Sequence, residues 1–563
     1  MKNITRKLGV LLFLVASACQ LDNDTVNPST LTPASADPDL LLNGAQLSFA
    51  TFFNTASGNT DQLVRINAMV GGYRYPTAIT ASSVNFLWSS AYQSILINTK
   101  ALIPIAQAKN LTTHVAIAKA LEAYVYLTLV DIFNDVPQSE ALLGVNFAPK
   151  LDNASEVYAY AIGLLSEART QLAKTGADAG TNISAGGDLY YAGDRANWTA
   201  LVNSLELKAW LNIRTLPTRA AEADGRITAL LTSNLIDSEA ENFTFKYGTA
   251  TVPNSRHPLY EQYYGLALGT AGGYIANYFM RELYTGYVDG AGDPIQDPRW
   301  RYYFYRQVGS VDPATAGFDV KALGCSPAAP PANYVAAGTV FCVFEPGFYG
   351  RDHGDASGTP PVGPVITCAG VYPAGGRPDN NGADATSPNG YNKPTIRGDG
   401  AFGAGIEPIF MSFFTDYMKA EILARRGNVA GAKTALTSAV TNSISQVQNF
   451  ALAKKQTVTP SRIPSISAYL TAVSSAYDAA PNKLDVIGRE FYVSLFGNGV
   501  EAYNSYRRTG APRNLQPTLQ TGAGPWTRAF PYPATYITLA GGTAKPNESV
   551  NKVFWDGNPE TLN

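Results

Sequence analysis

Aromatic and polar side chains gather in two stretches of the chain that have few signs of regular structure. In the first, Gly71, Gly72 and Pro76 interrupt a polar loop, and a helix is predicted to begin shortly after it. Its candidate binding residues are Tyr73, Arg74, Tyr75, Asn85 and Trp88. The second stretch contributes Trp300, Tyr302 and Tyr303. Aromatic faces pack on flat or apolar ligand surfaces, and Asn and Arg bind hydroxyls and carbonyls, so the chemistry indicated is binding of a ligand with few charges.

Catalytic chemistry has little support in the sequence. The three histidines, His114, His257 and His353, are far apart, and no HExxH spacing occurs. A glycosidase needs two carboxylates at a defined separation, but 44 acidic residues make chance pairs certain, so no pair is singled out. No GxSxG motif is present. We therefore predict that the protein is not an enzyme, and a hydrolase of glycans or peptides is the alternative.

Metal binding has a weak basis in the loop acids. Hard oxygen ligands are offered by Asp352, Asp355, Asp379, Asn380, Asn381 and Asp384. They do not follow the twelve-residue pattern of an EF-hand. We expect no cofactor and no metal site, and a structural calcium ion is the alternative.

Three cysteines, Cys325, Cys342 and Cys368, lie in one loop-rich stretch. They form no CxxC, and no histidine stands close to a cysteine pair, so a zinc site is not expected. In an oxidising compartment two of the three can form a disulfide, and the sequence does not choose which two.

The charge balance bears on the kind of partner. The net charge is −2, so there is no basic excess of the kind that binds nucleic acid. Charged residues make up only 15% of the chain and aromatic residues 11%, with 32 tyrosines. This composition is typical of a surface that hydrogen-bonds and stacks, although long surface loops rich in Tyr and Asn would give the same values.

Helical periodicity covers most of the chain outside residues 240–400. The predicted helices are 38–57, 85–108, 111–133, 153–174, 194–216, 218–233, 406–427, 429–450, 464–477 and 482–508. Short links join neighbouring helices into antiparallel pairs whose spacing resembles tetratricopeptide repeats. We therefore predict a mainly α fold, a helical-pair scaffold carrying a loop-rich insertion at about 240–400.

The N-terminus has the features of a secretory signal. Lys2, Arg6 and Lys7 precede an apolar run over residues 8–15, which is shorter than the ~20 residues that a membrane-spanning helix needs. Small residues then lead to Cys19, in a pattern that resembles a bacterial lipobox with Ala16 in the usual leucine position. We predict a signal peptide over 1–18 and lipid attachment at Cys19, with cleavage elsewhere as the alternative.

Residues 19–37 are polar and rich in Asn, Thr, Ser and Pro, as in a flexible linker. The acidic residues behind Cys19 resemble the signal that sends some lipoproteins to the outer face of the outer membrane. We predict a surface-exposed, lipid-anchored protein of the outer membrane whose residues 38–563 form a single domain.

Further motifs follow in order along the chain. They are FNDVP at 133–137 with SEA at 139–141, YMKAE at 417–421 with RG at 426–427, GREF at 488–491, EAYNSYRR at 501–508, and RAFPYP at 528–533. Together with the lipobox they resemble the SusD/RagB family of outer-membrane nutrient-binding lipoproteins. Asn134 stands where the family usually has glycine, and Arg508 where tryptophan is common. Trp555 and Asp556 fit a sub-branch of the family.

The resemblance implies a helical scaffold whose long loops form a ligand platform, without catalysis. It implies two partners: a glycan or peptide ligand, and a SusC-like TonB-dependent transporter barrel over which the protein sits as a hinged lid. The expected function is capture of an oligosaccharide or other oligomeric nutrient and its delivery to that barrel. A surface hydrolase, or a purely structural surface protein, is the alternative.

In this family the region around Trp88 often lines the ligand site. The resemblance therefore favours the first aromatic stretch as one wall of the site and the second, with Trp300, as the facing wall. The alternative is that Trp88 and Trp300 anchor the core beneath loops, because large aromatic side chains are buried on average.

Overall fold

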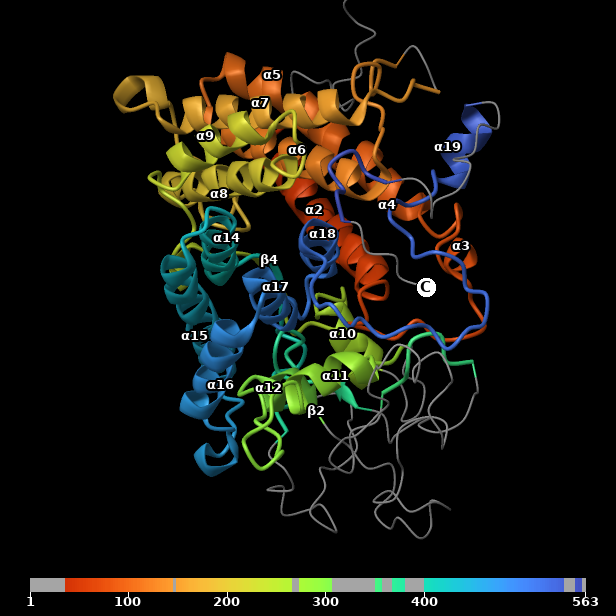
Figure 1. Ribbon diagram of the computed structural model, residues 1–563. Coiled ribbons are helices and arrows are strands. Elements are labelled where there is room, and N and C mark those ends of the chain that lie inside the picture. Colours follow the sequence, from red (N-terminus) through yellow and green to blue (C-terminus); the bar gives the residue numbers. More distant parts are fainter. Residues whose placement is uncertain are drawn as a thin grey trace, which may run out of the picture.

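The computed structural model describes residues 36–144, 148–265, 273–305, 350–356, 367–379, 399–540 and 552–558. Helices dominate these residues, and the prediction of a mainly α fold is confirmed (Figure 1). In the described part of the chain, no helix is both long and apolar enough to cross a membrane.

Helix α2 (Pro38–Asp61) runs through the middle of the molecule (Figure 1). Asp37 caps its start by accepting a hydrogen bond from the backbone N–H of Asp39. The predicted helix at 85–108 is a continuous rod made of α4 (Asn85–Ser89), a π-helical segment (Ser90–Leu96) and α5 (Ile97–Ala108). This rod packs along α2 because both present apolar faces to each other.

Consecutive helices then stack on one another, as the pair pattern predicts. These are α6 (Thr112–Phe133), α7 (Ala154–Leu172), α8 (Arg195–Ile213) and α9 (Ala220–Leu230). α6 is buried around almost its whole circumference, because α2, α5, α7 and α8 all pack against it. Asn153 and Asp194 cap the starts of α7 and α8 with their side chains.

A second helical group follows the loop-rich stretch. It contains α14 (Ser412–Arg425), α15 (Val429–Ala453), α16 (Ile466–Ala479), α17 (Lys483–Ser494) and α18 (Gly499–Thr509). α14 contacts α8, and α18 packs on α2, so the two groups share one core. Asn428, Ser465, Asn482 and Asn498 cap four of these helices.

Two predicted helices are wrong in part. The first five residues of the predicted 406–427 helix form strand β4 (Ile406–Phe410), which pairs antiparallel with β1 (Phe243–Lys246). The predicted 482–508 helix divides into α17 and α18. Gly497 adopts a φ of 95° at the break, and the side chain of Asn498 then caps α18. Apolar periodicity continues across both breaks, so the pattern did not reveal them.

The described residues between 240 and 400 form short elements, as the loss of periodicity predicts. They are α10 (Pro258–Tyr260), α11 (Asn277–Tyr284), α12 (Trp300–Tyr303), β2 (Phe304–Tyr305) and β3 (Cys368–Ala369), with β2 and β3 paired. Short helices elsewhere are α3 (Tyr75–Ala78) and α19 (Ala534–Leu539). The single-turn 3-10 and π segments are Gly176–Ala179, Glu239–Glu241, Glu261–Gly265 and Pro460–Arg462.

Candidate ligand-binding site

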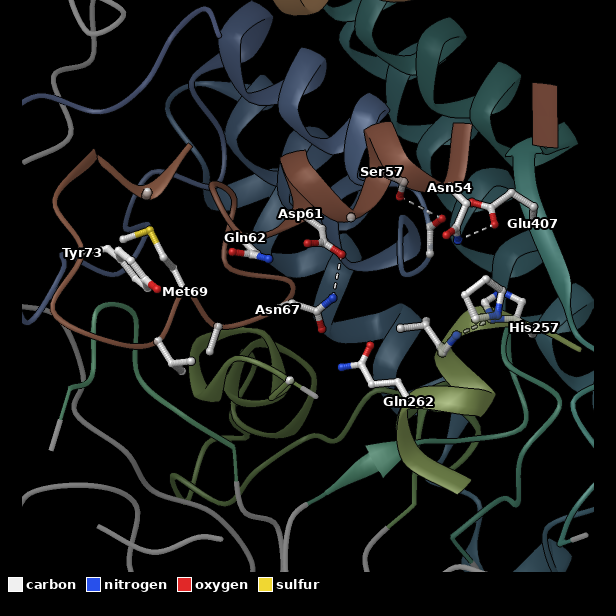
Figure 2. Close-up of a pocket in the computed structure, with 18 residues that line it drawn as sticks. Asn54, Ser57, Asp61, Gln62, Asn67, Met69, Tyr73, His257, Gln262 and Glu407 are labelled. Carbon is white, nitrogen blue, oxygen red and sulfur yellow. Dashed lines mark hydrogen bonds between the residues drawn. The ribbon is translucent and has the colours of Figure 1, made fainter. Parts of the chain in front are cut away.

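A polar cavity of about 510 Å³ lies against the C-terminal half of α2 (Figure 2). Its wall combines α2, the loop that follows α2, the segment around α10, and β4. The polar side chains that line it include Asn54, Asp61, Gln62, Asn67, Gln262 and Glu407. Carboxyl and amide groups thus converge on one hollow, as in a site that orients a hydrogen-bonding ligand.

The secondary structure explains how these groups meet. Asn54, Ser57 and Asp61 recur at steps of three and four, so α2 presents them on one face. β4 brings Glu407 to the same cavity, and the ladder with β1 holds it, since Phe245 pairs with Glu407. The site is therefore set between the helical scaffold and the loop-rich stretch.

Amides hold the two carboxyl groups in place. Asn54 Nδ2 donates to Glu407 Oε2 at 2.9 Å, and the hydroxyl of Tyr247 donates to the same oxygen at 3.2 Å. Asn67 Nδ2 donates to Asp61 Oδ2 at 2.6 Å. The other oxygen of each carboxyl group, Glu407 Oε1 and Asp61 Oδ1, is buried without a hydrogen-bond partner.

Burial changes the protonation of this cavity. It raises the pKa of Glu407 to about 8, despite the hydrogen bonds from Asn54 and Tyr247. Burial also raises the pKa of Asp61 well above its usual range, and the nearby charge of Glu407 adds to the effect. Burial lowers the pKa of His257 to about 3. Glu407 and His257 are therefore largely uncharged near neutral pH.

One predicted binding residue lines this cavity. Tyr73 is 50% exposed, and Figure 2 shows it at one end of the hollow. Arg74, the next residue, is exposed. Tyr75 is only 1% exposed: its hydroxyl accepts a hydrogen bond from Arg65 Nη2 and lies 3.2 Å from His353 Nε2. Tyr75 therefore anchors the loop that presents Tyr73 and Arg74.

Asn85 and Trp88 lie on α4, away from the cavity lining. The Asn85 side chain accepts hydrogen bonds from the backbone N–H and the hydroxyl of Thr535. Trp88 is 9% exposed and packs on four aromatic rings, those of Tyr92, Phe133, Tyr532 and Tyr536. Its surroundings match the alternative in which Trp88 anchors the core.

The second predicted wall lies inside the molecule. Trp300 and Tyr303 are fully buried, and Tyr302 is 4% exposed. Trp300 packs on the rings of Tyr284 and Phe304. The structure therefore places these three aromatics in the core rather than on an open wall facing Tyr73.

Sequence reasoning did not single out the cavity's own polar residues. One signal was available: Asn54, Ser57 and Asp61 interrupt the apolar residues of α2 at helical spacing. Glu407 likewise stands alone among apolar residues in β4. No sequence pattern joins these two segments, because they meet only in the folded chain.

The loop acids of the calcium alternative have other partners. Asp355 pairs with Arg351 at 2.9 Å, and Asp379 pairs with Arg301 at 2.8 Å. Among the described residues, no group of three or more His, Cys, Asp or Glu side chains gathers to hold a metal ion. Asn380, Asn381 and Asp384 lie outside the described residues. Three of the four cysteines, Cys19, Cys325 and Cys342, also lie outside the described residues, whereas Cys368 is buried in β3.

Solved structures share this fold. A SusD/RagB family protein from Bacteroides thetaiotaomicron is 17% identical, with a TM-score of 0.62 over 93% of this chain and 100% of that one. A chitin-binding SusD homolog from Flavobacterium johnsoniae is 16% identical, with a TM-score of 0.60 over 92% of this chain and 99% of that one. A SusD-like protein of the Bacteroidetes is 16% identical, with a TM-score of 0.64 over 93% and 100%.

No curated protein matches the chain. A protein-family model does match: the family described as "Starch-binding associating with outer membrane" covers residues 30–331 and 375–533. The match takes in both helical groups and every described residue that lines the polar cavity. The chain therefore belongs to the SusD-like family.

Proposed function

We propose that this protein captures an oligosaccharide at the outer-membrane surface and delivers it to a SusC-like TonB-dependent transporter barrel. The observation that carries the proposal is the polar cavity beside α2. Its amide and carboxyl groups suit a ligand that is rich in hydroxyl groups. Tyr73, half exposed at one end, offers an aromatic face for a sugar ring.

The comparisons support the same ligand class. The family description names starch, and one solved neighbour is a chitin-binding homolog. Both are glycans, so an oligosaccharide is favoured over a peptide as the ligand of this chain.

The membrane side of the proposal rests on the N-terminal sequence. A lipid on Cys19 holds the protein at the outer membrane, and residues 19–37 act as a tether for the domain of residues 38–563. Ligand that contacts both the domain and the barrel favours the closed lid over the open one, which is a population shift.

A surface hydrolase is the second candidate, because one cavity holds two carboxyl groups with raised pKa values. Glycosidases use such pairs, one as acid and one as nucleophile or base. The binding role is favoured because the matching family is described by binding.

A titration panel tests the proposal. The Cys19→Ala chain, made without the lipid, is titrated calorimetrically with soluble oligosaccharides, and each mixture is then analysed for cleavage products. We expect saturable binding of at least one oligosaccharide without products. Products would favour the hydrolase, and no binding across the panel would overturn the proposed function.

A matched pair of variants locates the site. Tyr73→Ala removes the exposed ring beside the cavity, and loss of one stacking contact should weaken binding by roughly tenfold. Tyr160→Ala removes a ring of similar exposure (40%) on α7, away from the cavity, and should leave affinity unchanged. Equal effects of the two variants would place the ligand elsewhere.

A further inference from the structure

Several buried carboxyl groups elsewhere in the described residues meet a positive charge. Glu421 Oε2 lies 3.0 Å from Arg508 Nε, and Asp297 Oδ2 lies 2.5 Å from Arg299 Nη2. Such pairing offsets the cost of removing a carboxylate from water. Other buried acids, such as Asp188 and Asp352, accept hydrogen bonds from neutral groups instead.

Asp61 and Glu407 also accept from neutral amides, but these two acids share one cavity. Asp61 is 8% exposed and Glu407 is 1% exposed, yet each has one oxygen without a hydrogen-bond partner. No Lys or Arg belongs to the described residues that line their cavity. Figure 2 shows both carboxyl groups on the same hollow, with amide side chains between and around them.

The histidine that lines the cavity and the phenols around the pair are neutral near pH 7. His257 keeps its proton on Nε2, which donates to the carbonyl of Ile406, while its Nδ1 accepts from the backbone N–H of Leu259. Its low pKa keeps the ring uncharged. The phenols that interact electrostatically with the two carboxyl groups have raised pKa values: Tyr190, Tyr247, Tyr263, Tyr372 and Tyr492.

The position of Asp61 at the end of α2 also favours binding of a cation. Asp61 is the last residue of α2, and the last turn contains no basic residue. A helix C-terminus carries a partial negative charge, which disfavours a carboxylate and attracts cations. The helix end and an ionised Asp61 would therefore both attract a positively charged ligand.

We propose that this cavity is selective for an ammonium group, carried by an amino-sugar residue of the captured oligosaccharide. The inference rests on the proposed function. Asp61 accepts hydrogen bonds from the ammonium at the end of α2, and Glu407 supplies a second negative charge. A sugar is favoured over a lysine-bearing peptide because the rest of the wall offers amides, from Gln62 and Gln262, together with the ring of Tyr73.

Binding also moves a proton. In the free protein, burial raises the pKa of Glu407 to about 8, so this carboxyl group is largely protonated at neutral pH. An ammonium keeps its own protons, so the O–H bond of Glu407 breaks, its proton leaves to the buffer, and Glu407 becomes the second negative charge. Uptake of an amino sugar therefore releases protons, whereas uptake of a neutral sugar does not.

Three β-1,4-linked hexaoses test the inference, because they share a backbone and differ at C2. They carry a hydroxyl group (glucose), an acetamido group (N-acetylglucosamine) or an ammonium group (glucosamine). Calorimetric titrations are run at about pH 6, where the amine is protonated, in two buffers of different ionisation enthalpy. We expect the glucosamine hexaose to bind about tenfold tighter than the others, with proton release.

Variants assign the preference to residues. Glu407→Gln and Asp61→Asn keep the size of the side chains and should each reduce the preference for the glucosamine hexaose to about twofold. Glu222→Gln, on the exposed face of α9, is the matched control and should keep the full preference. Thermal melts confirm that each variant is folded. If one carboxyl variant does not fold, the hexaose preference of the other variant tests the inference.

Equal affinity for the three hexaoses, or a preference that survives both carboxyl variants, would overturn the inference while leaving oligosaccharide capture intact. Hexalysine binding as tightly as the glucosamine hexaose would overturn the sugar assignment. Failure of all three hexaoses to bind would also overturn it, and the oligosaccharide panel then decides the proposed function separately.

Discussion

At the scale of single residues, Glu407 makes stability depend on pH. Its pKa is about 8 in the folded chain and about 4.5 in an unfolded one, so the folded state prefers the protonated form. This contribution to stability is fully present below about pH 4.5 and is lost as pH rises through about 8. The full loss is on the order of 5 kcal/mol.

We therefore expect the free energy of unfolding of wild type to fall between about pH 5 and pH 8, and that of Glu407→Gln to fall less. Denaturant unfolding at several pH values measures this difference. Parallel pH profiles for the two proteins would show that Glu407 titrates normally. Glu222→Gln is again the control.

Trp88 belongs to the core on the evidence of its four aromatic neighbours. Trp88→Ala should lower the free energy of unfolding by about 3–5 kcal/mol, because it leaves a cavity among rings. Tyr73→Ala, at a half-exposed position, should change it by less than about 0.5 kcal/mol. Thermal melts of the two variants distinguish these outcomes, and a stable Trp88→Ala would return Trp88 to the ligand site.

At the scale of secondary-structure elements, Arg508 ties three helices together. From α18 it donates to both oxygens of Glu421 on α14, at 3.1 and 3.0 Å, and to Asn212 Oδ1 on α8 at 2.8 Å. Arg425, in contrast, reaches Glu421 from within α14 and is partly exposed. The arrangement explains how arginine functions where tryptophan is common in the family.

Arg508→Ala should therefore cost about 3–5 kcal/mol of unfolding free energy, because it leaves Glu421 buried with less compensation. Arg425→Ala removes a partly exposed partner and should cost about 1 kcal/mol or less. Urea unfolding of both variants provides the test. Similar losses in the two would mean that Arg508 does not hold the helices together.

The FNDVP turn shows how a motif works at the same scale. Asn134 ends α6 with a φ of 72°, a conformation that glycine adopts most easily. Its side chain also accepts a hydrogen bond from the backbone N–H of Phe554 at 2.7 Å. Asn134 thus meets the backbone requirement of the usual glycine and adds a contact with the C-terminal segment.

At the scale of the whole molecule, the helical scaffold and the loop-rich stretch meet along α2 (Figure 1). The polar cavity opens at that junction, with α2 on one side and the segment around α10 on the other. The site therefore forms only when both parts of the domain are packed together.

Membrane attachment and partnership are tested on the intact protein. Cys19→Ala should move the protein from the outer-membrane fraction to the soluble fraction, because the lipid is its proposed anchor. Wild type with a C-terminal tag, purified in mild detergent, should bring down a large β-barrel in near-equal amount. Retention of Cys19→Ala in the membrane would contradict the anchor, and recovery of the protein alone would contradict the delivery role.

Much of the scaffold could be predicted from the sequence, because helical periodicity and capping are local. The helices at 111–133, 153–174 and 429–450 lie within a few residues of α6, α7 and α15. The motifs at Glu421 and Arg508 also pointed to the family that the comparisons show. These features depend on residues close together in the chain, which a sequence displays directly.

The exposure of each aromatic residue was decided only by tertiary structure. Trp300 and Tyr73 are equally plausible as ligand contacts in sequence. In the fold, however, Trp300 is buried against the rings of Tyr284 and Phe304, while Tyr73 stays half exposed. The placement of Asp61 and Glu407 on one cavity was likewise decided by packing, since α2 and β4 are far apart in the chain. Burial and electrostatic environment are properties of what surrounds a residue, and only the folded chain supplies those surroundings.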